Sequence, residues 1–268
     1  MRHHRRRIAG VLRHMRGCRP NTHDSRDFVH TDLFGPATFT PSASFSGLRS
    51  ELEHLGIYDQ GPEGSCSWNM GCRIMRALGQ KLGMSLPDLS RQFGYYATRV
   101  WVEGADPMDD SGCMIRDVVK SGRLFGVCLE ETWPYSRPMD VCPSPQAIRE
   151  ARDHQVLRYG AARDLRAMQT CIERDRTPVG IRFDLPEYVD SDACAKDGVV
   201  PWQAGQKPIG SHAMVLEAWE TLPSGIVMLD LTNSWGESWG DRGHMHADAR
   251  YLTSGAITDG TVITSAET

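Results

Sequence analysis

The clearest periodic pattern lies over residues 66–82, where apolar residues recur at spacings of three and four. The members of the apolar stripe are Met70, Ile74, Ala77 and Leu78. This spacing is typical of a helix with one buried face, and Gly83 provides a stop. The pattern therefore predicts a helix that begins at Cys66, directly after the glycine-bearing turn GPEGS.

Other segments of the first two thirds are also helical in pattern. They cover residues 86–102, 114–124, 145–153 and 165–174. Pro87 suits a first helical turn, and Asp164 can cap the last of these helices. Residues 24–50 are polar and rich in turn formers, so we expect extended chain along the surface there.

Short β-rich segments dominate the last third, at residues 179–183, 213–219 and 226–232. The last two are joined by the hairpin-like connection ETLPSG. Because helices precede strands, we predict an α+β fold with two lobes: a helical lobe over about residues 51–125 and a sheet-rich lobe over about residues 178–252. We expect one domain over residues 23–268, with its lobes meeting near residues 125–180.

Composition adds a charged N-terminal arm to this picture. The first 20 residues hold seven arginines and no acid, whereas the remainder carries 23 basic and 34 acidic residues, a net of −11. We interpret residues 1–22 as a flexible basic arm that can contact an anionic partner, such as nucleic acid, an acidic membrane surface or an acidic protein. The arm lacks the apolar core of a secretory signal, and no segment approaches the ~18 apolar residues of a membrane span.

The eight cysteines do not form the close pairs of a structural zinc site. Without an export signal, we expect reduced thiols, although a bridge between Cys128 and Cys142 stays open. One cysteine stands in a reactive setting: Cys66 opens the first predicted helix, where the helix dipole favours a thiolate.

Three further residues suit chemistry with a thiol. Gln60 can donate to an oxyanion. His212 begins a predicted strand and can act as a base, and Asn233 ends the next strand and can orient the imidazole. Gly64 lets the chain turn close to a substrate, Ser65 can cap the helix, and Trp235 can shield the histidine–asparagine bond from water.

These stretches resemble the papain-like cysteine peptidases, the papain and cathepsin family. The resemblance rests on DQGPEGSCSWNMG, GSHAMVLEAW and NSWGESWGDRG, which carry Gln60, Cys66, His212 and Asn233 in the family's order. The cysteine-to-histidine spacing of 146 residues lies within the family's range. Asn233 lies 167 residues beyond Cys66, which implies an insertion before the histidine. Weaker matches, such as DDSGCMIRDVV and DGVVPW, extend the resemblance over about residues 20–252.

The resemblance implies a two-lobed papain-like fold with the active site between the lobes. It also implies Cys66, His212, Asn233 and Gln60 as catalytic residues, and substrate contacts from Gly64, Ser65, Gly112, Ser211 and Trp235. Glu63 stands where secreted members have a disulfide cysteine, and Ser67 stands where a tryptophan is usual. The chain is thus most similar to bacterial and viral members without that disulfide and without a long pro-region, and we expect no conventional zymogen.

We therefore expect a cysteine-type peptidase that needs no metal or organic cofactor and cleaves peptide or protein substrates as a monomer. The expected location is the cytoplasm or, for a viral protein, the virion. Two alternatives stay open. One is an amidase, isopeptidase or transpeptidase on the same fold, and the other is a catalytically retired binding or structural component. The residues do not distinguish endopeptidase from exopeptidase action.

Overall fold

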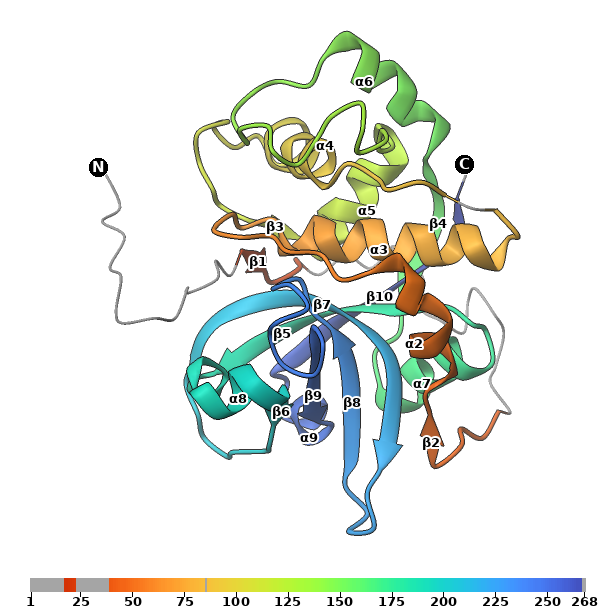
Figure 1. The fold of residues 1–268 in the computed structure, drawn as a ribbon, viewed down its shortest axis with the longest axis vertical. Helices are drawn as coiled ribbons and strands as arrows, with labels where there is room; N and C mark the ends of the chain where they lie inside the picture. Colours follow the sequence, from red (N-terminus) through yellow and green to blue (C-terminus); the bar gives the residue numbers. More distant parts are fainter. Residues whose placement is uncertain (1–16, 23–38, 85, 267–268) are drawn as a thin grey trace.

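The structure is a computed structural model that describes residues 17–22, 39–84 and 86–266. A helical lobe and a sheet lobe lie on either side of the long helix α3 (Figure 1). The α-helices are α2 (Gly47–Leu52), α3 (Cys66–Lys81), α4 (Arg91–Tyr96), α5 (Ile115–Leu124), α6 (Pro145–Glu150), α7 (Leu165–Glu173), α8 (Asp192–Asp197) and α9 (Arg250–Thr253). The 3₁₀-helices are η1 (Glu53–Leu55), η3 (Ala151–Asp153) and η4 (Glu187–Asp190), and η2 (Ala97–Val102) is a π-helix.

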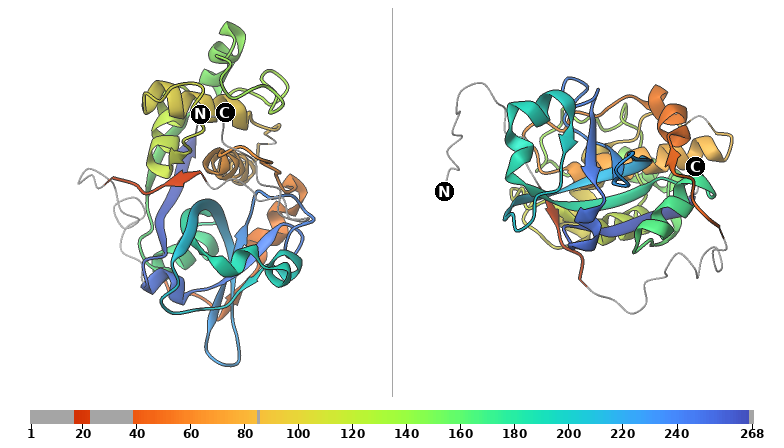
Figure 2. Two further views of the ribbon diagram at one scale, coloured as in Figure 1. Left: turned by 90° about the vertical axis from the view of Figure 1, so that its left-hand side faces the viewer. Right: turned by 90° about the horizontal axis from the view of Figure 1, so that it is seen from below.

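The sheet lobe is built on an eight-stranded sheet of order β4-β10-β5-β7-β8-β9-β6, with β2 also paired to β7. Its strands are β2 (Ser44–Phe45), β4 (Val156–Ala161), β5 (Val179–Pro186), β6 (Val199–Val200), β7 (Pro208–Thr221), β8 (Val227–Thr232), β9 (His244–Asp248) and β10 (Ile257–Ala266). A separate parallel pair joins β1 (Cys18–Arg19) to β3 (Cys113–Met114). Figure 2 shows the sheet curving beneath the helical lobe.

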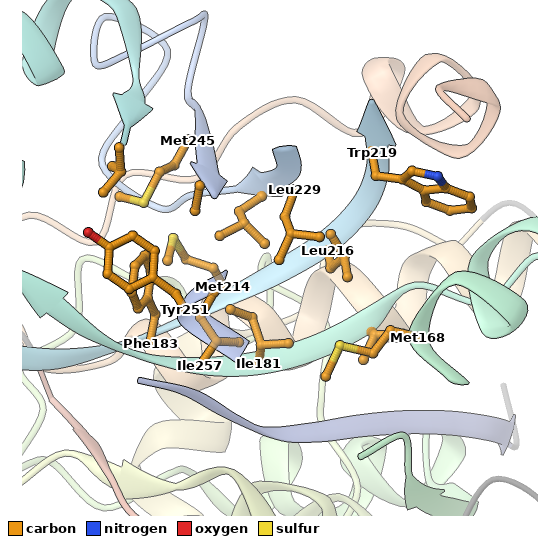
Figure 3. Close-up of a cluster of buried hydrophobic side chains, with 14 of the residues drawn as sticks. Met168, Ile181, Phe183, Met214, Leu216, Trp219, Leu229, Met245, Tyr251 and Ile257 are labelled. Carbon is orange, nitrogen blue, oxygen red and sulfur yellow. The ribbon is translucent and has the colours of Figure 1, made fainter. Parts of the chain in front are cut away.

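Each lobe has its own buried core. The core of the sheet lobe contains Ile181, Phe183, Met214, Leu216 and Leu229, which interdigitate between the strands and α7 (Figure 3). The core of the helical lobe is formed largely by α3, α4 and α5 and reaches the opposite face of β7. The lobes therefore share β7, so both sides of this strand are packed.

Close approach between the lobes depends on a glycine. A Cβ atom at Gly180 of β5 would lie 2.6 Å from Sδ of Met70 on α3. The missing side chain lets α3 lie directly on the sheet. A buried ion pair then joins the same helix to β7, with Arg73 Nε donating to Glu217 Oε1 over 2.5 Å.

Most predicted helices are present, and one is different. The helix from Cys66, the helix that ends at Leu124 and the helix capped by Asp164 are confirmed, and Asp164 accepts from Ala167 N–H at 2.8 Å. The expected helix over residues 86–102 is wrong at its start. Ser90 caps α4 by accepting from Phe93 N–H at 3.0 Å, so Pro87 precedes the helix, and the last turns are the π-helix η2.

The predicted strands are confirmed as β5, β7 and β8, but the sheet extends further than expected. Strands β4 and β10 lie outside the expected range of 178–252 for the sheet-rich lobe. Within residues 24–50, expected to be extended, residues 47–50 belong to α2. Residues 23–38 and most of the basic arm, residues 1–16, lie outside the described residues. The described end of that arm is not loose, because it contains β1.

Candidate active site

The nucleophile candidate, Cys66, is the first residue of α3 and is completely buried. Burial raises the pKa of its thiol. Backbone hydrogen bonds from Ala213, Gly17 and Ser67 act in the opposite direction, because N–H groups that point at the sulfur stabilise its negative charge. The site thus holds donors for a thiolate but also excludes the water that would solvate one.

The base candidate, His212, is joined to Asn233 by a hydrogen bond of 2.7 Å between Nε2 and Oδ1. His212 directly precedes Ala213, whose backbone N–H contacts the Cys66 sulfur, so the strand that carries His212 runs beside the thiol. Because Nε2 is bonded to Asn233, Nδ1 is the ring nitrogen on the side away from the asparagine. Pairing of β7 with β8 brings the histidine and asparagine together across 21 residues of sequence.

Trp235 covers this hydrogen bond. Its ring stacks on His212 with centroids 4.6 Å apart and meets Trp239 edge-on at 4.8 Å. Both His212 and Asn233 are buried beneath it. The shielding predicted for Trp235 is thus present, and its ring lies against the imidazole.

Gln60 is held rigidly next to the asparagine loop. Its Oε1 accepts from Ser234 Oγ at 2.7 Å, and its Nε2 donates to the carbonyl of Glu63 at 2.7 Å. An amide nitrogen carries two hydrogens, so the bond to Glu63 is compatible with a second bond to an oxyanion.

Ser65 differs from its expected role. It occupies the position before α3, but its side chain makes no capping bond. Its buried hydroxyl is hydrogen-bonded to the Tyr135 hydroxyl and accepts from Asn69 Nδ2 at 3.2 Å. The side chain is therefore part of the packing beneath the cysteine loop, and its contact with a substrate stays a prediction.

Residues 17–22 form an N-terminal strap that runs past Cys66. A Cβ atom at Gly17 would lie 2.2 Å from the Gly64 carbonyl oxygen, and one at Gly112, where φ is +69°, would lie 1.5 Å from the Gly17 carbonyl oxygen. The same Gly17 carbonyl accepts from Cys113 N–H at 2.9 Å. The two glycines expected to contact substrate therefore contact an extended segment of this chain.

The strap is bound to both lobes. Arg19 forms an ion pair with Glu103 of the helical lobe. Asn21 Oδ1 accepts from Arg116 N–H at 2.9 Å, and Asn21 N–H donates to Asp259 Oδ2 of the sheet lobe at 3.3 Å. The strap thus bridges the two lobes next to the nucleophile (Figure 1), contrary to our expectation of a loose arm at these residues.

A charged cluster lies under the strap on the sheet side. Arg182 Nε donates to Asp259 Oδ2 at 3.1 Å, and Arg182 also pairs with Asp184. Ser211, expected to contact substrate, bonds to Asp184 and accepts from Arg182 at 3.1 Å. Arg182, Asp184 and Asp259 were not predicted from the sequence as site residues. The available signal was a charged residue within the otherwise apolar strand segment VGIRF.

Cysteines and possible metal ligands make up the remaining candidate chemistry. All eight cysteines lie in the described ranges and are free, with Cys128 buried and Cys142 exposed. Within residues 17–22, 39–84 and 86–266, no group of histidine, cysteine and acidic side chains is arranged to hold a metal ion. None of the helices in the described part of the chain has the length and hydrophobicity to cross a lipid bilayer.

Comparison with known proteins gives one curated relative and many similar structures. An uncharacterized peptidase C1-like protein of Acanthamoeba polyphaga mimivirus is 27% identical, over 74% of this chain and 66% of the relative. The chain thus spans slightly under two thirds of that relative's length. No protein-family model matches the chain.

Among solved structures, xylellain, a cysteine protease from Xylella fastidiosa, matches with a TM-score of 0.77 and 24% identity, over 97% of this chain and 99% of xylellain. The digestive procathepsin L2 proteinase from Tenebrio molitor larval midgut matches with a TM-score of 0.71 and 18% identity, over 94% of this chain and 78% of the proteinase. The predicted α+β, two-lobed fold is confirmed by these similarities.

Proposed function

We propose that this chain, which has the fold of the papain-like cysteine proteases, is a cysteine peptidase that hydrolyses peptide bonds through an acyl-enzyme. One observation carries the proposal: the His212–Asn233 pair lies under Trp235, and the residue after His212, Ala213, directs its backbone N–H to the sulfur of Cys66 at the start of α3. Nucleophile, base and orienting group are thus adjacent, as thiol catalysis requires.

The first half of the reaction forms the acyl-enzyme. His212 Nδ1 takes the proton of the Cys66 thiol, and the thiolate attacks the carbonyl carbon of the substrate. The oxyanion receives hydrogen bonds from Cys66 N–H and Gln60 Nε2. Protonated His212 then gives its proton to the leaving amine as the C–N bond breaks, which leaves a thioester on Cys66.

The second half releases the product. A water molecule gives a proton to His212 and attacks the thioester carbonyl, and the oxyanion is again held by the same donors. Collapse of this intermediate breaks the C–S bond and yields a carboxylic acid, while the thiolate recovers its proton from His212. Asn233 keeps the imidazole in one orientation through both halves.

The N-terminal strap determines how a substrate reaches Cys66. It presents a backbone N–H of Gly17 to the sulfur, while the Gly17 carbonyl is held by Cys113. This arrangement offers the nucleophile a donor and not a carbonyl carbon. A substrate must displace the strap, and that displacement also rehydrates the thiol and reduces the burial that raises its pKa.

The setting of this activity is part of the same proposal. The substrates are peptides or proteins, and the enzyme acts as a monomer in a reducing compartment such as the cytoplasm. Eight free cysteines support a reducing compartment. The arginine-rich residues 1–16, which lie outside the described part of the chain, are proposed to bind an anionic partner.

A thiol-directed epoxide probe followed by mass spectrometry tests the proposal. We expect labelling at Cys66, loss of label and of peptide hydrolysis in Cys66→Ala, and no loss in Cys142→Ser. Cys142 is a suitable control because it is the exposed cysteine. Labelling at Cys142 with Cys66 untouched, or peptide hydrolysis retained by Cys66→Ala, would contradict the proposed function.

A further inference from the structure

The face of the sheet that supports α3 continues past Cys66 as a charged surface. In the antiparallel pair of β5 and β7, Gly180 lies opposite Val215, Arg182 opposite Ala213 and Asp184 opposite Ser211. Alternate residues of a strand share a face, and Gly180 of this set packs on α3. Arg182 and Asp184 therefore continue that face beyond the helix start, beside the residue whose N–H contacts the Cys66 sulfur.

The cluster carries a net negative charge. Two carboxylates, Asp184 and Asp259, surround one guanidinium, and the donors of Arg182 are directed to those carboxylates and to Ser211. The described bonds use Asp184 Oδ1 and Asp259 Oδ2, one oxygen from each carboxylate. Arg182 therefore holds the two carboxylates in place, and its donors are directed to them and not to a further anion.

Asp259 is held in a conformation that costs free energy. Its φ of +58° lies in the left-handed region, in an irregular part of β10 between Thr258 and Thr261. A residue other than glycine is uncommon there, although aspartate and asparagine tolerate it best. The conformation turns the carboxylate to Arg182 and to the backbone of Asn21 in the strap.

The strap traces a path for a peptide over this cluster. Gly17 lies at the Cys66 sulfur, and the next side chain, Cys18, is buried near enough to Arg182 and Asp259 for their charges to act on the pKa of its thiol. With the strap in place, the exposed fractions are 10% for the side chain of Arg182, 26% for Asp184 and 16% for Asp259. A substrate that follows the same path places a side chain on the two carboxylates.

We propose that Asp184 and Asp259, braced by Arg182, form a specificity site for a lysine or arginine side chain within two residues of the scissile bond. This inference rests on the proposed function and names its substrate class. A cationic side chain neutralises the excess carboxylate and gains charge-assisted hydrogen bonds. An acidic side chain meets two like charges and is disfavoured.

The test measures the rate at which Cys66 of the full-length protein is labelled by peptidyl epoxides that carry arginine, norleucine or glutamate. An Arg19→Ala background loosens the strap equally for every probe. We expect arginine probes to react about tenfold faster than norleucine probes at one position, and glutamate probes to react most slowly. The double variant Asp184→Asn, Asp259→Asn is expected to lose the arginine advantage while keeping the norleucine rate within about threefold.

Controls separate this inference from the proposed function. Asparagine preserves the left-handed conformation at position 259, and Asp192→Asn removes one negative charge, half the change made by the double variant, at the exposed start of α8. Thermal melting checks folding. If the simple epoxide labels Cys66 but arginine probes have no advantage, or keep it in the double variant, the specificity site is wrong and the proposed function stands. If no probe labels Cys66, both fail.

Discussion

The helical lobe and the sheet lobe contact the N-terminal strap with different chemical groups. On the helical side, Gly64 and Gly112 present bare backbone, and Cys113 N–H pairs with the Gly17 carbonyl of the strap. On the sheet side, Asp259 accepts from the strap at Asn21 N–H, and Arg182 joins Asp259 to Asp184. Cys66, the proposed nucleophile, lies between the helical wall formed by Gly64, Gly112 and Cys113 and the sheet wall formed by Asp184 and Asp259.

This difference assigns separate tasks to the two walls. Backbone groups are common to every peptide, so a wall built from glycine and main-chain donors accepts any sequence that can lie extended. Charged side chains discriminate, because their interaction free energy depends on the side chain presented to them. The helical wall is expected to hold the peptide and the sheet wall to select it.

The largest expected effect comes from a substitution at Asn233, which belongs to neither wall. Asn233→Ala removes the acceptor that orients His212, so kcat is expected to fall about 100-fold for basic and neutral peptides alike, with KM little changed. Steady-state kinetics on one basic and one neutral peptide measure this effect. A variant that keeps wild-type kcat, or loses activity on only one peptide, would remove Asn233 from the catalytic group.

The next largest effect breaks the helical wall. In Gly112→Ala the new Cβ would collide with the carbonyl of any chain that follows the path of the strap. We expect kcat/KM to fall about 30-fold for every peptide, with the ratio between basic and neutral peptides unchanged. Gly104→Ala is a matched control, because Gly104 has the same φ of +69° but no atom within 4 Å of the new Cβ. A change in that ratio would contradict the separation of tasks.

Much of this site could be predicted from sequence because it depends on local signals. The helix from Cys66 follows from a periodic stripe, and the order of Gln60, Cys66, His212 and Asn233 follows from motifs. The packing of α3 against β7 is a tertiary contact, but Cys66 opens a predicted helix and His212 directly precedes the apolar segment predicted as a strand. Catalytic candidates at the ends of predicted helices and strands could therefore be identified from the sequence.

The residues of the sheet wall could not be predicted from the sequence, for a physical reason. Arg182, Asp184 and Asp259 come from β5 and β10, and β10 was not predicted at all. Their proximity arises from strand pairing between distant segments, which local periodicity does not encode. The strap was missed because its arginine-rich surroundings favoured a solvated tail, whereas Gly17 fits against Gly64 and Gly112 only in three dimensions.

A smaller effect follows from the strap, which touches both walls. Arg19→Ala removes the ion pair with Glu103 and favours displacement of the strap, so kcat/KM is expected to rise about three- to fivefold for all peptides. Arg152→Ala, an exposed arginine of η3 in the helical lobe, is the control. A fall in activity would instead indicate that the strap supports the active conformation and does not compete with substrate.

The last effect concerns the stability of the helical wall, where Glu63 directly precedes Gly64. Burial raises the pKa of Glu63 from 4.5 to about 7, and the charge of Asp110 adds to this shift. The unfolded chain ionises near pH 4.5, so the folded state holds the proton more tightly. Glu63 therefore does not lower the free energy of unfolding below pH 4.5. As the pH rises from 4.5 to about 7, the free energy of unfolding falls by at most about 3 kcal/mol.

Replacement by a neutral side chain isolates this contribution. Glu63→Gln should unfold at higher urea concentration than the parent at pH 8 and at nearly the same concentration at pH 4.5, whereas the exposed Glu237→Gln should show no such dependence on pH. Because the Glu63 carbonyl accepts from Gln60 Nε2, the variant should keep its oxyanion donor and its activity. An equal gain at both pH values would mean that packing, and not the buried charge, limits stability at this wall.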